Sequence, residues 1–96
     1  MDVYELLREQ RDNVIKIASK HGVTHIRIFG SAARGESRED SDIDFLIEVN
    51  GPTTPWFPGS LAADLEKLLG RHVDVIEPEA IRKPLRERIL QEAVPL

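Results

Sequence analysis

Hydrophobic and polar residues follow one another along this chain with two different periods, and the periods predict its secondary structure. In three segments apolar residues recur every three or four positions, which is typical of helices that bury one face. In two segments they recur at every second position, which is typical of strands, and a third short apolar run also resembles a strand. The predicted elements are a helix over 2–21, a strand over 23–29, a short helical turn over 31–34, a strand over 42–49, a helix over 60–69, a strand over 72–76 and a last helix with Pro84 in its first turn.

The ends of these elements carry capping and stop signals. Asp2 is suited to cap the first helix, because its carboxylate can accept hydrogen bonds from the free N–H groups of the first turn. Ser31 and Ser60 are expected to cap the two helical segments that follow in the same way. Gly22 and Gly70 can adopt the left-handed conformation that ends a helix.

Helices and strands alternate along the chain, which predicts an α/β fold with about three strands covered by helices. In the strand over 42–49, Ile43, Phe45 and Ile47 would face the core, so that Asp42 and Asp44 would face the other way. A chain of 96 residues can form one modest core, and we expect residues 1–96 to be a single domain.

Composition narrows the functional classes. The net charge of −4 argues against sequence-independent binding of nucleic acid, so no direct nucleic-acid partner is expected. The chain has no cysteine, which excludes disulfides and thiolate chemistry and suits a reducing cytoplasm. No apolar stretch approaches the ~20 residues of a membrane helix, and the first residues do not resemble a signal peptide. We therefore expect a cytoplasmic protein without a membrane segment.

The segment that follows the first predicted strand has features of a phosphate-binding turn. Gly30 would let the backbone approach a ligand, since no side chain intervenes. The free N–H groups of the turn favour an anion. The Ser31 hydroxyl could add a hydrogen-bond donor and Arg34 a charged one. A Gly–Ser pair before a helix is common, so this pattern alone is weak.

Three aspartates suggest a metal site. Asp42 and Asp44 are two residues apart on a predicted strand, so both carboxylates project from one face. Side-by-side carboxylates repel one another unless a cation lies between them, and Mg²⁺ is a cation that takes oxygen ligands. Asp74 lies among apolar residues of the next strand, where a carboxylate is unfavourable unless it has a partner. Taken alone, Asp42 and Asp44 could simply form a solvated acidic turn. The third carboxylate, Asp74, makes a metal site the better interpretation.

These residues carry a resemblance to a known family. Gly30–Ser31, ten further residues, Asp42–Ile43–Asp44 and a third aspartate on a later strand resemble the nucleotidyltransferase superfamily related to DNA polymerase beta. In so short a chain, the string Gly-Ser-Ala-Ala-Arg-Gly followed by Ser-Asp-Ile-Asp is similar to the minimal nucleotidyltransferases. These are antitoxins of toxin–antitoxin pairs whose toxin is a HEPN-domain ribonuclease. The resemblance implies a small nucleotidyltransferase fold with a short mixed sheet.

The resemblance also implies a reaction and assigns roles. Asp42, Asp44 and Asp74 would ligate Mg²⁺, with two ions expected, and Asp74 would also act as the base. Gly30 and Ser31 would hold the triphosphate of ATP. Arg34 and Ser41 match motif positions, and their roles as nucleotide-binding residues are less defined. The implied reaction transfers AMP from ATP to a hydroxyl, which is expected to be a tyrosine of the partner toxin.

Other residues allow two interpretations. Trp56 and Phe57, on a proline-rich loop over 50–58, could cover the core or anchor a partner. The basic stretch from Arg82 to Arg88 is expected to be a solvated helix face, with contact to a toxin or its RNA as the alternative. The histidines 21, 25 and 72 share no spacing with one another or with cysteines, so no metal site is expected from them.

Two rivals to the enzymatic antitoxin stay open. In the first, the domain neutralises a toxin by binding alone, and its nucleotide site has no catalytic role. In the second, the chain is the catalytic half of a two-chain transferase that acts on a small molecule or RNA. The three aspartates favour an enzyme, because binding alone gives no physical reason to gather carboxylates on one face.

Overall fold

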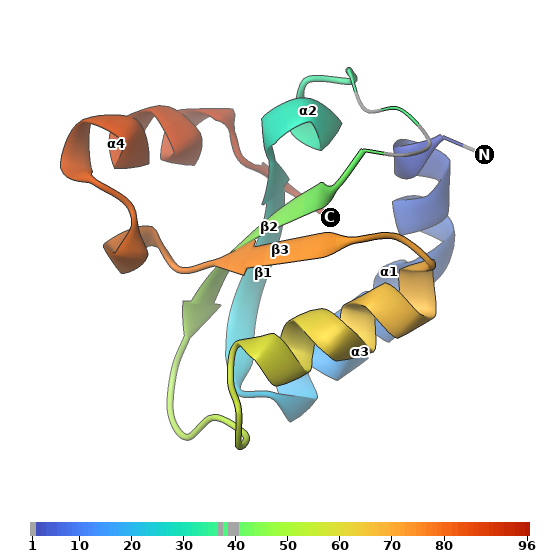
Figure 1. The fold of residues 1–96 in the computed structure, drawn as a ribbon, viewed down its shortest axis with the longest axis vertical. Helices are drawn as coiled ribbons and strands as arrows, with labels where there is room; N and C mark the ends of the chain where they lie inside the picture. The colour runs from blue at the N-terminus through green and yellow to red at the C-terminus, as the bar shows by residue number, and fades with distance from the viewer. Residues whose placement is uncertain (1, 37, 39–40) are drawn as a thin grey trace.

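The computed structural model describes residues 2–36, 38 and 41–96, and it contains a four-stranded sheet with helices on both faces (Figure 1). Residues 37, 39 and 40 of the predicted loop after the short helical turn lie outside this description. The elements are α1 (Val3–Lys20), β1 (Val23–Phe29), α2 (Gly30–Ala33), β2 (Ile43–Val49), α3 (Gly59–Leu69), β3 (Val73–Ile76), the 3₁₀ turn η1 (Pro78–Ala80), α4 (Lys83–Glu92) and β4 (Val94–Pro95).

The sheet is mixed, as the resemblance implies. Its strand order is β3-β2-β1-β4, with β2 parallel to β3 and β1 antiparallel to both β2 and β4. The α/β class is confirmed, but the prediction of three strands is wrong by one. The fourth strand, β4, is only two residues long and includes Pro95, so it carries no alternating pattern; proline is tolerated because β4 is an edge strand.

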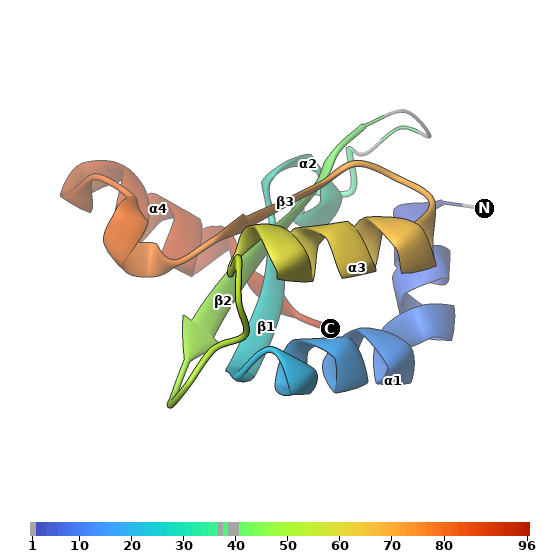
Figure 2. The same ribbon diagram turned by 60° about the horizontal axis from the view of Figure 1, so that its bottom comes forward.

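Strand β2 lies at the centre of the molecule and separates two apolar clusters. Ile43, Phe45 and Ile47 are fully buried on one face, in the core that α1 and α3 cover. Leu46 points to the other face and packs with Phe29 of β1 and with Ile81, which follows η1, beside α4. The predicted alternation along this strand is confirmed. Figure 2 shows α1 and α3 side by side on their face of the sheet.

The helix ends agree only in part with the predicted signals. Asp2 caps α1, since its Oδ1 accepts a hydrogen bond from the Glu5 N–H at 2.9 Å. The predictions for Ser31 and Ser60 are wrong, because α2 already begins at Gly30 and α3 begins one residue before Ser60. At the start of α3 the carbonyl of Trp56 accepts the Ser60 N–H at 3.0 Å, so a backbone group does what the hydroxyl was expected to do.

The proline-rich loop divides its two aromatic residues between the core and solvent. Phe57 packs against the main core, whereas Trp56 is 89% exposed. The loop is held by His21, which is buried at the end of α1, contacts the Thr54 hydroxyl through Nδ1 and lies 2.7 Å from Asp64 Oδ2 through Nε2. The hydrogen bond with His21 lowers the pKa of Asp64. The interpretation as a core residue is thus confirmed for Phe57, whereas Trp56 is exposed and its role as an anchor for a partner stays a prediction.

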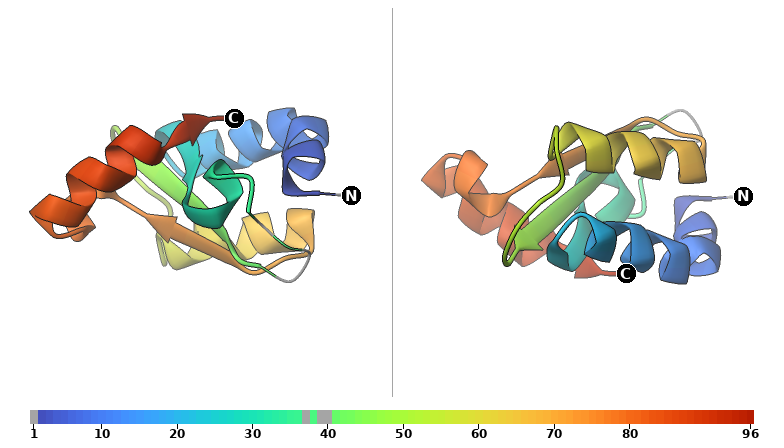
Figure 3. Two further views of the ribbon diagram at one scale, coloured as in Figure 1. Left: turned by 90° about the horizontal axis from the view of Figure 1, so that it is seen from above. Right: turned by 90° about the horizontal axis from the view of Figure 1, so that it is seen from below.

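Helix α4 lies at the opposite end of the molecule from the N-terminus (Figure 3). Its Ile89 packs against the second apolar cluster, while Leu85 is 52% exposed and Leu90 36% exposed. The basic stretch at its start is largely exposed, as predicted, although Arg86 turns back to donate to the Ile81 carbonyl at 3.0 Å. Among the described residues, no helix has the length and apolar character needed to cross a membrane.

Candidate functional site

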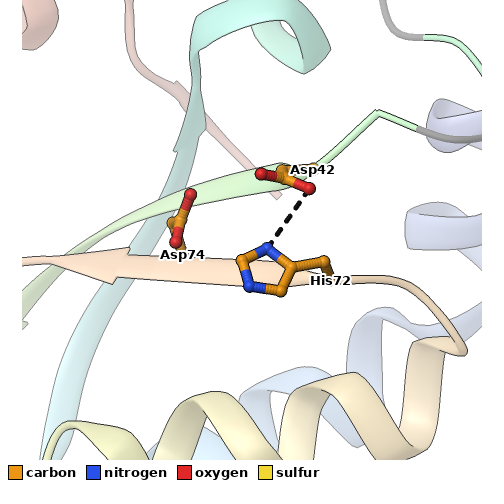
Figure 4. Close-up of side chains that lie close together, drawn as sticks. All are labelled: Asp42, His72 and Asp74. Carbon is orange, nitrogen blue, oxygen red and sulfur yellow. Dashed lines mark ion pairs between the residues drawn. The ribbon is translucent and has the colours of Figure 1, made fainter.

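Three aspartates lie at the end of the sheet where β2 and β3 begin. In the parallel pairing of these strands, Asp44 is directly opposite Asp74. Paired residues of neighbouring strands project from the same face, so the two carboxylates lie side by side. Asp42 comes two residues before Asp44, immediately ahead of β2, and its carboxylate lies close to that of Asp74 (Figure 4).

The electrostatics of this cluster favour a cation. Burial, together with the neighbouring negative charges of Asp74 and Asp42, raises the pKa of the Asp44 carboxyl from 3.8 to about 6. The negative charges are thus held together at a cost to the metal-free protein. A divalent cation would remove that cost, and carboxylate oxygens are the donors that Mg²⁺ prefers. The residues present therefore fit a hard divalent metal ion.

His72 joins the aspartates, which the sequence reasoning did not foresee. Its Nδ1 lies 3.2 Å from Asp42 Oδ1, and one ligand atom each of Asp42, His72 and Asp74 lie within 4.8 Å of one another. The signal was present in the sequence: His72 stands two residues before Asp74, as Asp42 stands two before Asp44. The two pairs become neighbours only through the register of β2 and β3, which spacing along the chain does not give.

Gly30 connects the predicted phosphate-binding turn to the carboxylates. It has a φ of +69°, a conformation that residues with a side chain rarely adopt. A Cβ atom at this position would lie only 2.5 Å from Asp44 Oδ2. The glycine is therefore required by the approach of a carboxylate from its own chain, whereas the sequence suggested the approach of a ligand. It places the start of α2 next to Asp44.

Arg34 lies at the rim of the cluster and is paired with two glutamates. Its Nε donates to Glu36 Oε2 at 3.0 Å, and its Nη1 contacts Glu92 at the end of α4. These hydrogen bonds raise the pKa of Arg34. Arg34 is also near enough to Asp44 to lower the pKa of that carboxyl slightly. The structure thus places Arg34 beside the site with its guanidinium turned to α4.

Ser41 has a local structural role in this state. Its Oγ accepts a hydrogen bond from the Arg38 N–H at 3.0 Å, and its carbonyl accepts one from Arg71 Nη2 at 2.7 Å. Both contacts shape the chain just before Asp42. Of the residues expected from the sequence, the three aspartates and Gly30 come together, and Arg34 lies beside them. Ser31 follows Gly30 in α2, and Ser41 holds the chain just before Asp42.

Comparison with known proteins finds a matching family model and similar relatives. A family model described as a nucleotidyltransferase domain matches residues 8–96. The chain is 42% identical over 88 residues to the candidate protein adenylyltransferase MJ0435 of Methanocaldococcus jannaschii, covering 92% of this chain and 95% of the relative. It is 33% identical over 79 residues to the protein adenylyltransferase MntA of Thermococcus cleftensis, covering 82% of this chain and 80% of the relative.

Solved structures show the same fold. One described as a candidate minimal nucleotidyltransferase has a TM-score of 0.86 at 43% identity and covers 100% of this chain and 97% of that chain. Another, a toxin–antitoxin with AMP-PNP, has a TM-score of 0.74 at 21% identity and covers 88% of this chain and 69% of that chain. At that identity the second likeness concerns the fold alone.

Proposed function

Because this chain belongs to the nucleotidyltransferase family, as a minimal member of the superfamily related to DNA polymerase beta, we propose that it transfers AMP from ATP to a hydroxyl group of a partner protein. The observation that carries the proposal is the register of β2 and β3, which sets Asp44 opposite Asp74 and brings Asp42 beside them. Gathering carboxylates at a cost in charge repulsion is explained by catalysis and not by binding alone.

In this proposal Asp42, Asp44 and Asp74 hold Mg²⁺, with two ions as the expected number. When bound, Mg²⁺ would supply positive charge to the triphosphate and to the departing pyrophosphate. Gly30 and Ser31 hold the triphosphate next to the carboxylates. The acceptor hydroxyl attacks the α-phosphorus of ATP, its proton passes to a carboxylate oxygen of Asp74, and the bond to pyrophosphate breaks.

The proposed partner is a toxin. This part is supported by the relative named as a protein adenylyltransferase and by the toxin–antitoxin structures that share the fold. The family resemblance further suggests that the toxin is a HEPN-domain ribonuclease and that a tyrosine accepts AMP.

The test is the intact mass of the toxin that co-purifies with this chain, measured after incubation with ATP and Mg²⁺. The proposal expects a gain of whole AMP units, which disappears when Asp42 and Asp44 are both changed to Asn. Asp12→Asn is the matched control, since Asp12 is an exposed carboxylate of α1 outside the site, and it should leave the gain unchanged. A toxin that stays bound and silenced without any gain in mass would overturn the proposal in favour of neutralisation by binding.

A further inference from the structure

We propose that His72 is a metal ligand of this site. With Asp42 and Asp74 it forms a cation position that prefers a divalent transition ion, such as Mn²⁺ or Zn²⁺, to Mg²⁺. This inference rests on one part of the proposed function, namely that the aspartate cluster binds a metal ion. It goes further by giving this chain a nitrogen donor and hence a different metal preference.

The spacing of the three side chains suits one ion. Ligand atoms about 2.1 Å from a metal lie about 3–4.2 Å from one another, depending on the angle between them. His72 Nδ1 and Asp42 Oδ1 are 3.2 Å apart, and the atoms offered by Asp42, His72 and Asp74 all lie within 4.8 Å. Small side-chain rotations bring all three onto one ion, and Figure 4 shows the three groups turned toward a common space.

The strand register makes this arrangement a property of the fold. The Ile43 N–H donates to the His72 carbonyl at 3.0 Å, so the parallel pairing of β2 and β3 extends to the start of both strands. His72 is therefore the cross-strand neighbour of Asp42, as Asp74 is of Asp44. The two pairs stand next to each other on one face of the sheet.

A carboxylate also lies on the other side of the imidazole, near Nε2. His72 Nε2 lies 3.7 Å from Glu66 Oε2, which is a charge contact and too long for a hydrogen bond. That carboxylate is itself held, because Oε2 accepts the Val73 N–H at 3.0 Å. When a metal takes the Nδ1 lone pair, the ring proton stands on Nε2, on the side where this carboxylate lies.

The imidazole nitrogen is the reason that this site should prefer a transition ion to Mg²⁺. Mg²⁺ favours oxygen ligands and keeps several waters, whereas imidazole suits transition ions. The simpler alternative is a protonated His72 that pairs with Asp42 on the surface, where an ion pair contributes little. In that case the positive charge of the imidazolium balances Asp42, and the protonated ring has no lone pair with which to bind a metal ion. The two possibilities differ in whether nitrogen contacts the bound metal.

The experiment uses Mn²⁺ as a paramagnetic probe with the purified chain. Bound Mn²⁺ is counted by electron paramagnetic resonance, and electron spin echo modulation detects nitrogen directly bound to it. We expect nitrogen coupling in the wild type, its loss in His72→Gln, and a Mn²⁺ affinity lower by roughly tenfold or more in that variant. The affinity for Mg²⁺, measured by competition, should change much less.

His25→Gln is the matched control. His25 is another exposed histidine, and its Nδ1 lies 3.4 Å from Glu48 Oε2 at the far end of the sheet. This variant should keep both the nitrogen coupling and the affinity. Mn²⁺ that binds the wild type without nitrogen coupling would overturn the role of His72 and leave the proposed function intact. Mn²⁺ that binds equally well after both Asp42→Asn and Asp44→Asn would overturn the aspartate metal site itself, and with it both proposals.

Discussion

Changing Asp44 to asparagine is expected to stabilise the metal-free protein at neutral pH, although Asp44 belongs to the proposed catalytic site. In the folded protein, burial and the charges of Asp74 and Asp42 raise the pKa of Asp44 from 3.8 to about 6. The fold therefore prefers this carboxyl in its neutral form. Asparagine has a similar shape and is neutral at every pH, so it removes the charge repulsion and keeps most of the packing.

The magnitude follows from the shift. A change of one pKa unit corresponds to about 1.4 kcal/mol, so a shift of about two units sets an upper bound of about 3 kcal/mol. Asp44 is only half-buried, and solvent screens part of this cost. We therefore expect Asp44→Asn to gain about 1–2 kcal/mol in unfolding free energy at pH 7.5, which is about 4–16 °C in melting temperature for a domain of this size.

The sign depends on pH. Because the folded pKa of Asp44 lies above its unfolded value, the wild type is relieved of this cost below pH 3.8. It loses that advantage as the pH rises through about 6. The stability difference between Asp44→Asn and the wild type should thus be small near pH 3.5, just below the unfolded pKa, and reach its full size at pH 7.5. Urea denaturation at both values, with a chelator present, measures it.

Two controls make the test decisive. Asp12→Asn removes an exposed carboxylate of α1 and should show no such dependence on pH. Saturating Mg²⁺ should stabilise the wild type more than Asp44→Asn, since a ligand of the folded state stabilises only the protein that binds it. A variant that is less stable than the wild type at pH 7.5, or equally altered at both pH values, would refute the idea that these carboxylates repel one another.

Further substitutions test the surroundings of the cluster. Gly30→Ala and Gly70→Ala should each lose about 1–2 kcal/mol of stability, because both positions have a φ near +68°. Only Gly30→Ala should also lose Mg²⁺ binding in calorimetry, since its Cβ meets Asp44 whereas nothing lies within 4 Å at Gly70; equal binding by both variants would contradict this. Glu92→Gln should strengthen the binding of a non-hydrolysable ATP analogue by about 2–5-fold, because it releases Arg34 from α4. Unchanged or weaker binding in titration calorimetry would show that the pairing does not compete with nucleotide.

The elements predicted from hydrophobic periodicity are those of the structure because their patterns reflect one buried face each. In β2 the apolar residues Ile43, Phe45 and Ile47 recur at every second position, and this was enough to give both the strand and its orientation, although Leu46 between them is apolar as well. The strand β4 could not be predicted, because two residues carry no period and depend on pairing with β1. The start of α3 was misplaced because a backbone carbonyl, and not the Ser60 hydroxyl, accepts at that end.

The site was predictable where its residues are close in sequence. Asp42 and Asp44 were found by their spacing, and Asp74 by its place in an apolar strand. His72 and the contact of Arg34 with Glu92 were not, since each depends on which distant segments the fold brings together. The contact between Gly30 and Asp44 was missed for the same reason, although both residues were recognised.

The parallel register of β2 and β3 has a consequence for folding fidelity. The pairing that sets Asp44 beside Asp74 also buries Ile43 and Val73 in the main core. A slip of one residue would exchange the two faces of a strand, driving carboxylates into the core and apolar side chains into solvent. A register that misaligns the proposed catalytic site therefore also loses the stability that comes from burying the core. The burial that stabilises the fold therefore also selects the strand register that aligns the site. Molecules with an intact core and a misaligned site should not accumulate.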